Sequence, residues 1–224
     1  FDEGFFTLPE DGWIYRDWKE GGHGNTNLFK AITQSSNTYF FDLAYRSDIN
    51  QLNKHLSSLG FGDKACIDCF EEDQVFVPEP SWKMNKHNFG WFKGDTVNMG
   101  VGQGYLVSTP IQLAKYAYIM ANKGKFSDLS LKKDIVKSEK SIEFNKFSND
   151  DWFKLHESMV NVIEGNTGTA RRLREKKNYI VAAKTGTAEL VSGDNREQYS
   201  ETRLDDSLRD HALIIAFGPM PNPR

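Results

Sequence analysis

The sequence predicts an α+β fold, with an antiparallel sheet packed with helices, and three features indicate it. Helical patterns, with apolar residues three or four positions apart, fill the first and middle parts of the chain. Two strand-like runs come late, at 179–183 and 212–217. The polar connection between them, Leu190 to Arg209, is too long for a tight hairpin. Because two strands make a marginal sheet, we expect further strands from sequence outside this chain.

Residues that favour helix starts precede the predicted helices. The expected caps are Asn25, Asp48, Thr109 with Pro110 after it, and Ser148 with Asp151 three positions on. Glycines are expected to end three of these helices, at Gly60, near Gly124 and at Gly165. The run from Gln34 to Asn37 holds several turn-forming residues and predicts a break between two helices.

The remaining segments have no clear helical period. The ranges 1–24 and 62–94 are expected to be loops or short strands, and the lysine-rich range 127–147 an exposed excursion. The range 190–209 is polar and charged, and we expect either a mobile lid over a site or a plain disordered connection.

Composition limits the possible functions. With 224 residues, 38% of them hydrophobic, the chain can form one sizeable domain. A formal net charge of -3 gives no electrostatic case for nucleic acid binding. No apolar run approaches the length of a membrane span, and no signal peptide opens the chain. Because the chain starts abruptly and stops just after a strand-like run, we expect truncation at both ends.

The two cysteines, Cys66 and Cys69, are separated by two residues. This spacing suits half of a zinc site or a redox pair. A four-ligand zinc site needs more soft ligands than the segment offers, so we favour cysteines that pack in a loop or strand, reduced or bridged.

The most informative stretch is Ala182 to Ala188, where a lysine, two threonines and a glycine follow a buried run. Lys184 can hold a carboxylate or carry protons, and Thr185 and Thr187 add hydroxyl donors. Gly186, inside a strand pattern, suggests that another backbone comes close. The stretch therefore predicts a sheet edge that receives an acylating, carboxylate-bearing substrate. The alternative is a strand that simply ends at a lysine and a glycine turn.

A second polar group lies at the predicted break between helices. Ser35 can shuttle a proton between a nucleophile, a lysine and a leaving amine. Asn37 can orient a substrate amide and a lysine at once. Helix capping is the alternative, because serine and asparagine are also favoured caps.

Together, Ser35-Ser36-Asn37 and Lys184-Thr185-Gly186 resemble the second and third signatures of the penicillin-recognising serine acyltransferases. Within that superfamily the chain is similar to the penicillin-binding protein 2 group, the elongation-specific class B transpeptidases. The supporting segments are Tyr15 to Lys19, Gly22 to Gly24, Gly94 to Thr96, Gly100 to Tyr105, Thr109 to Ala114 and Leu208 to His211.

The resemblance implies a D,D-transpeptidase that cross-links peptidoglycan stem peptides ending in D-alanyl-D-alanine and is trapped by β-lactams. It implies that Ser35 relays protons, Asn37 binds the acyl amide, and Lys184 supplies the electrostatic field. Thr185 and Thr187 would bind the substrate carboxylate, and the Thr187 N–H would form half of an oxyanion hole. It also implies a place on the periplasmic side of the inner membrane and, in the full-length protein, a glycan polymerase of the elongation complex as partner.

One departure from the family pattern concerns the first signature, serine-x-x-lysine. No such motif here occupies a fitting place. We therefore expect residues 1–224 to be a partial transpeptidase domain that lacks the nucleophile, its general base, the closing strand and the C-terminal helix, and to be inactive alone. The alternatives are a non-catalytic penicillin-binding-like scaffold, a β-lactamase and a β-lactam sensor module.

Asp2, Asp17 and His23 form a weak candidate zinc site beside Ser36. The resemblance implies it, because some family members carry a cysteine at the position of Ser36. Serine replaces a thiolate poorly, so we favour loop hydrogen bonding and expect no cofactor.

Overall fold

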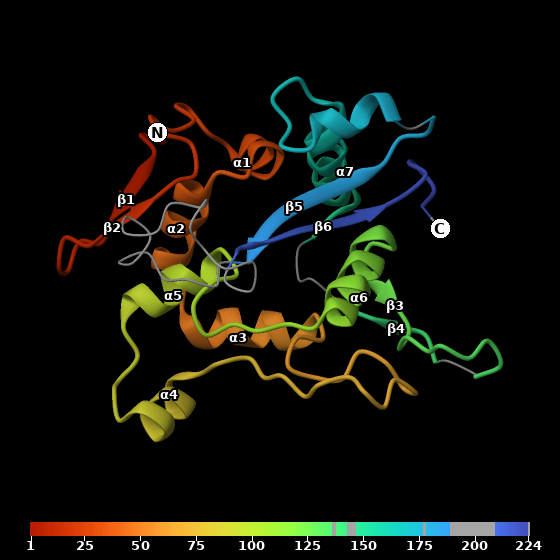
Figure 1. Ribbon diagram of the computed structural model, residues 1–224, viewed down its shortest axis with the longest axis horizontal. Coiled ribbons are helices and arrows are strands. Elements are labelled where there is room, and N and C mark those ends of the chain that lie inside the picture. The colour runs from red at the N-terminus through yellow and green to blue at the C-terminus, as the bar shows by residue number, and fades with distance from the viewer. Residues whose placement is uncertain (136–137, 143–146, 177, 189–208, 224) are drawn as a thin grey trace.

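The computed structural model describes residues 1–224 except 136–137, 143–146, 177, 189–208 and 224 (Figure 1). Helices and three two-stranded antiparallel sheets alternate along the described chain. The elements are β1 (Phe5–Thr7), β2 (Ile14–Arg16), α1 (Leu28–Gln34), α2 (Asn37–Arg46), α3 (Ile49–Ser58), α4 (Pro80–His87), α5 (Lys93–Gly100), α6 (Pro110–Ala121), β3 (Lys125–Phe126), β4 (Lys140–Ser141), α7 (Asn149–Glu164), the 3-10 helix η1 (Arg171–Lys176), β5 (Ala182–Ala188) and β6 (His211–Phe217).

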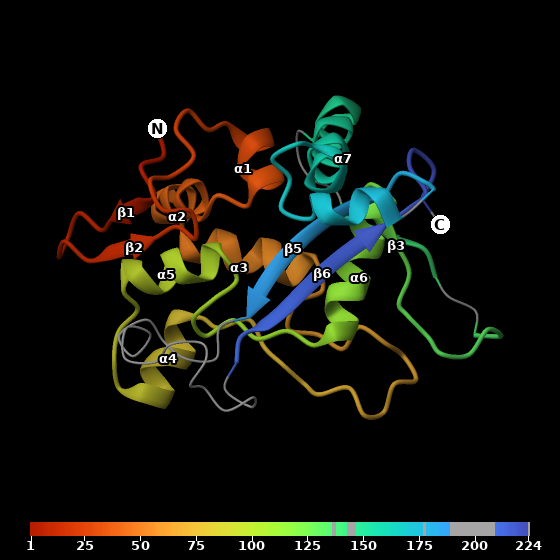
Figure 2. The same ribbon diagram turned by 45° about the horizontal axis from the view of Figure 1, so that its top comes forward.

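The longest sheet, β5 with β6, lies between helices. Helix α7 packs against β5 and α6 against β6, and α1 packs against α7 (Figures 1 and 2). The main core joins these elements through Ile119, Met120, Trp152, Met159, Ala182 and Phe217. Because β5 and α1 both pack on α7, residues at the end of α1 are brought beside the strand.

A second core holds the N-terminal part together. Leu8, Phe41 and Val97 are buried, so the β1–β2 hairpin, α2 and α5 share one apolar cluster. Helices α2 and α5 approach closely, since a side chain on Gly100 would put its Cβ 2.3 Å from the Cβ of Ala44. This cluster fixes α2, and with it the break between α1 and α2.

The predicted helix signals are largely confirmed. Asp48 caps α3, Thr109 caps α6 with Pro110 first in the helix, and Ser148 and Asp151 form a capping box on α7. Helix α7 ends at Gly165 as expected. The predicted α+β class and the antiparallel pairing of the two late strands are also confirmed.

Three expectations about local structure are wrong. Asn27, not Asn25, caps α1, because the Asn27 side chain accepts the Lys30 N–H at 2.9 Å. The range 62–94 contains a full helix, α4, and the start of α5, because Pro80 opens a helix there rather than extending a loop. The buried strand expected from Tyr179 begins at Ala182, and Tyr179 is exposed.

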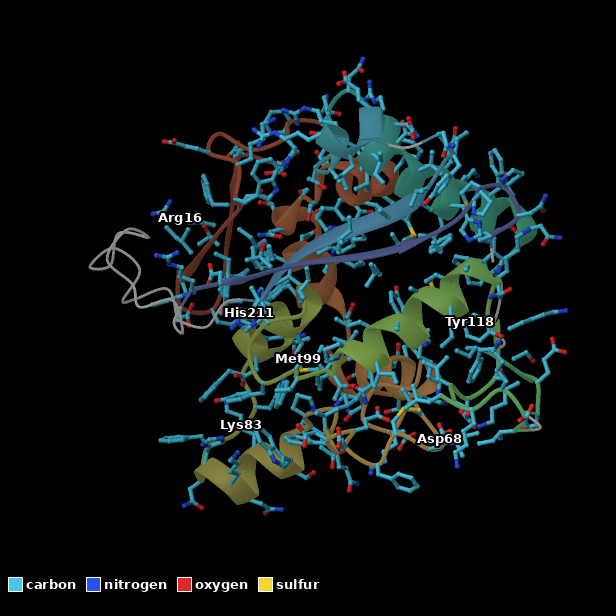
Figure 3. The ribbon with its side chains drawn as sticks, turned by 45° about the vertical axis from the view of Figure 1, so that its right-hand side comes forward. Arg16, Asp68, Lys83, Met99, Tyr118 and His211 are labelled. Atoms are coloured by element: carbon cyan, nitrogen blue, oxygen red, sulfur yellow. A yellow bond between two sulfur atoms is a disulfide. The ribbon has the colours of Figure 1, made fainter. Side chains whose placement is uncertain are left out.

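The cysteines form a disulfide, Cys66–Cys69. The disulfide lies in the loop between α3 and α4. Figure 3 shows that the neighbouring Asp68 lies on the opposite side of α6 from β5 and β6. Most of the predicted lid at 190–209 falls on residues 189–208, which lie outside the described residues. Among the helices described, none has the length and apolar character needed to cross a membrane.

Candidate active site between the α1–α2 break and strand β5

Ser35 is held at the turn between two helices. Helix α1 ends at Gln34, and Ser35 takes a left-handed conformation with φ of 57°. Its N–H bonds back to the carbonyls of Ala31 and Ile32. The Trp18 indole N–H donates to the Ser35 carbonyl at 2.9 Å. These bonds fix the Ser35 backbone and therefore the direction of its side chain.

Ser36 and Asn37 continue the turn into α2. Ser36 is fully buried and caps α2 by accepting the Tyr39 N–H at 3.2 Å. The capping alternative therefore applies to Ser36 and leaves the hydroxyl of Ser35 free for other contacts. Asn37 is the first residue of α2 and is half-buried, and among the described residues no hydrogen bond joins its side chain to Lys184.

Lys184 of β5 meets Ser35. The Lys184 ammonium donates to Ser35 Oγ at 2.7 Å and to the Thr185 carbonyl at 2.8 Å. Burial lowers the pKa of Lys184 from its ordinary value to about 8. A lysine with this pKa is still mostly protonated at neutral pH, yet it can release its proton far more readily than a surface lysine. The contact can therefore pass a proton between the two side chains.

One edge of β5 faces away from β6. Lys184 Nζ binds the Thr185 carbonyl, and the Gln103 side chain donates to the Thr187 carbonyl at 2.8 Å. In an antiparallel strand the N–H and C=O of one residue point to the same edge. The N–H groups of Thr185 and Thr187 therefore face the edge opposite β6, where an extended ligand can lie.

Gly186 leaves this part of the strand open. Of the described residues, a side chain there would meet Leu213 alone, with its Cβ 3.9 Å away, which is an ordinary contact. Among the described residues no backbone of this chain approaches Gly186 on that side, so the approach of another backbone there stays a prediction. The space it leaves can be filled by a ligand backbone.

The sequence did not single out two residues that contact this strand. Gln103 lies between Gly102 and Gly104, both with positive φ, so its flanking glycines were the available signal. Thr169 has its hydroxyl oxygen 2.7 Å from that of Thr185. No sequence pattern marked Thr169, because the contact depends on how α7 packs against β5.

The sequence model of a protein family, described as the penicillin binding protein transpeptidase domain, matches residues 1–224 of this chain. The chain belongs to this transpeptidase family. It is 37% identical to the peptidoglycan D,D-transpeptidase MrdA of Haemophilus influenzae, over all of this chain and 36% of that protein. It is also 37% identical to MrdA of Acinetobacter baumannii, over 99% of this chain and 34% of that protein.

Solved structures of penicillin-binding proteins share the fold. The penicillin-binding protein 2 of Pseudomonas aeruginosa, solved in complex with WCK 5153, superposes with a TM-score of 0.85 at 33% identity, over 100% of this chain and 48% of that one. The penicillin-binding protein 2 of Helicobacter pylori, solved in complex with MreC, superposes with a TM-score of 0.85 at 31% identity, over 99% of this chain and 38% of that one. The expected resemblance and fold are confirmed, and the chain spans about a third of the length of the curated relatives it matches.

The candidate metal ligands of this transpeptidase chain do lie together. His23 Nδ1 is 2.8 Å from Asp2 Oδ2 and 3.7 Å from Asp17 Oδ2. Ser36 Oγ donates to the same Asp2 oxygen at 2.7 Å. Burial opposes ionisation of Asp2, but the hydrogen bonds from Ser36, Gly4 and His23 lower its pKa below the ordinary value.

The cluster brings two carboxylates and one imidazole together, but its fourth donor is the Ser36 hydroxyl, which is a poorer zinc ligand than a thiolate. Ligands around tetrahedral zinc lie roughly 3.3 Å apart, whereas the two Asp2 contacts have hydrogen-bond lengths. Asp17 is also engaged, since it accepts the N–H of Thr38 at 3.0 Å. Asp2, His23 and Ser36 form a hydrogen-bonded cluster that ties the N-terminal segment to the turn carrying Ser35.

Proposed function

We propose that this chain forms the carboxylate-binding and proton-transfer half of a peptidoglycan D,D-transpeptidase site, which β-lactams also occupy. The observation that carries the proposal is the contact of Lys184 with Ser35 beside the free edge of β5. The similar proteins named MrdA are peptidoglycan D,D-transpeptidases, which supports the same reaction here.

The stem peptide lies along β5 as an added strand. Backbone groups at the free edge pair with its backbone, as in other cases of strand addition. Thr185 and Thr187 share one face of the strand, because residues two apart do, and their hydroxyls bind the terminal carboxylate of the substrate. The Thr187 N–H points to the free edge and donates to the carbonyl oxygen when it becomes an oxyanion.

The polar side chains move the protons. Ser35 relays a proton between the nucleophile and the leaving D-alanine amine, and Lys184 holds Ser35 in position and exchanges protons with it. Asn37 binds the amide of the acyl portion. Its side chain has no partner in the site among the described residues, which leaves it available to a ligand.

The nucleophile comes from sequence outside the printed chain, in a serine-x-x-lysine motif. Its hydroxyl oxygen attacks the penultimate D-alanine carbonyl, the peptide bond breaks, and the terminal D-alanine leaves with the proton. An amine of a neighbouring stem peptide then attacks the acyl ester, forms the cross-link and returns the serine hydroxyl. A β-lactam enters the first step only, and its ring-opened acyl group stays on the serine.

The proposed setting is the periplasmic face of the inner membrane, within the machinery of cell elongation. The similar Helicobacter pylori protein was solved in complex with MreC, which supports a scaffold partner of that kind. A glycan polymerase of the elongation complex is the second proposed partner.

Labelling with a fluorescent penicillin tests the proposal. The full-length gene product should be labelled covalently, and Lys184→Ala should lose nearly all labelling while its thermal unfolding midpoint stays close to wild type. Lys154→Ala is the matched control, because Lys154 is an exposed lysine on α7 whose ion pair is with Asp150 on the same helix.

Two outcomes would reject the proposal. If the Lys184→Ala variant is labelled at near the wild-type rate, Lys184 has a structural role and does not take part in acylation. Labelling without any cross-linking of a stem-peptide donor and acceptor would favour a β-lactam sensor instead.

A further inference from the structure

The turn between α7 and η1 contacts both walls of the site. Thr169 Oγ1 lies 2.7 Å from Thr185 Oγ1, next to Lys184 in the strand. The Gln34 side chain, next to Ser35, donates to Thr167 Oγ1 at 3.0 Å. Two threonines of one short turn therefore reach the two chain segments that carry the proton-transfer pair.

This turn is held rigidly on the end of α7. The Ala170 N–H donates to the Val162 carbonyl at 2.9 Å, and Ala170 packs with Val162 and Ala183 in a buried cluster. Gly168 has no room for a side chain, since its Cβ would lie 2.3 Å from the carbonyl oxygens of Asn161 and Val162. Thr169 lies between these two anchored residues, so its position relative to β5 is fixed.

The direction of the hydrogen bond between the two threonines matters. Each hydroxyl has a single hydrogen to donate. If Thr185 donated to Thr169, only oxygen lone pairs would face a carboxylate at Thr185, and the two would repel. If Thr169 donates to Thr185, the Thr185 hydrogen remains for the carboxylate, and the donated bond makes Thr185 a stronger donor.

We propose that Thr169 is a positioning residue that donates to Thr185 and so keeps the Thr185 hydroxyl directed at the ligand carboxylate. The inference rests on the proposed function, in which Thr185 binds that carboxylate. It makes the site selective for stem peptides and β-lactams that carry a free carboxylate over ligands in which this group is neutral. Thr169 acts through Thr185 and has no contact with the reacting atoms.

The experiment compares two forms of one ligand on the full-length gene product. The probes are a fluorescent penicillin and its methyl ester, whose carboxylate is masked. Acylation is followed against probe concentration, which separates the half-saturating concentration from the limiting rate. The variants are Thr169→Val, which keeps the shape but not the hydroxyl, and Thr169→Ser, which keeps the hydroxyl.

Thr169→Val should raise the half-saturating concentration of the acid probe about tenfold and change the limiting rate less than about twofold. Its acylation by the ester should stay close to wild type, so the acid-over-ester preference falls about tenfold. Thr169→Ser should restore the wild-type preference. Thr7→Val is the matched control, since Thr7 is exposed on β1.

A structural role for Thr169 would weaken acid and ester equally, and that result would overturn the inference. An unchanged preference in Thr169→Val would also overturn it. Should Thr169→Val fail to fold, Thr169→Ala makes the same comparison without adding a methyl group at a new position. If the wild-type protein is acylated by neither probe, the proposed function itself is wrong. That result differs from the ones that overturn the role of Thr169, so the two failures can be distinguished.

Discussion

The ammonium group of Lys184 lies 2.7 Å from the hydroxyl oxygen of Ser35, although 149 positions separate the two residues. The contact exists because α1 and β5 both pack on α7. It joins a lysine whose pKa is lowered to about 8 by burial with the hydroxyl of a serine held in a left-handed turn.

Replacing Ser35 with alanine should slow acylation of the full-length gene product about 10²–10⁴-fold, the range expected for loss of a proton relay. The fold should persist, because the backbone of Ser35, not its hydroxyl, makes the turn bonds. Stopped-flow labelling with a fluorescent penicillin measures the rate, with Ser141→Ala as control on an exposed strand. A rate within twofold of wild type would remove Ser35 from the reaction.

The stability conferred by position 184 should depend on pH above about 8. The folded-state pKa of Lys184 is lowered to about 8 from 10.5, so between these values the unfolded chain binds more protons than the folded one. Stability therefore rises with pH across that window, as the buried charge is relieved. Below about 8 both states are protonated and the contribution is constant.

Denaturant unfolding at pH 7 to 10.5 measures this effect as the difference between wild type and Lys184→Met. The wild type should gain on the order of 1–3 kcal/mol relative to the variant over the window, an amount reduced by partial solvent screening. A difference that stays flat, or that falls with pH, would contradict the lowered pKa.

Ser36→Ala should destabilise the protein by about 1–3 kcal/mol. The buried Asp2 carboxylate would lose one of its donors, and α2 would lose its cap. Chemical denaturation gives the free energy of unfolding. Ser58→Ala, at an exposed hydroxyl that bonds only a local carbonyl, should change it by less than about 0.5 kcal/mol. An equally small effect at Ser36 would show that the cluster does not stabilise the turn.

Metal removal should leave the protein unchanged. Since Asp2 is hydrogen-bonded to His23 and Ser36, and Asp17 accepts the N–H of Thr38, we expect no stoichiometric metal in the purified full-length gene product and no fall in its unfolding midpoint after dialysis against a chelator. Elemental analysis and calorimetry test this directly. Bound zinc near one equivalent, with a midpoint that drops on chelation, would contradict it.

Local patterns predicted much of the secondary structure. Thr109 with Pro110 and Ser148 with Asp151 act within one turn of helix, so their chemistry is visible in the sequence alone. The helix at Pro80 was missed because its neighbours are aromatic and charged without a clear apolar period. Tyr179 was wrongly placed in a strand, since its apolar character suggested burial that the packing does not provide.

The sequence by itself determined the family, the break at Ser35 and the stretch around Lys184, because these depend on residue identity and short spacing. Only the tertiary structure decided that Lys184 reaches Ser35, that Gln103 and Thr169 support β5, and that Asp2, His23 and Ser36 bond directly. Those contacts join residues far apart in the chain. Their geometry is set by how α1, α7 and β5 pack, and no local pattern in the sequence specifies which distant residues that packing brings into contact.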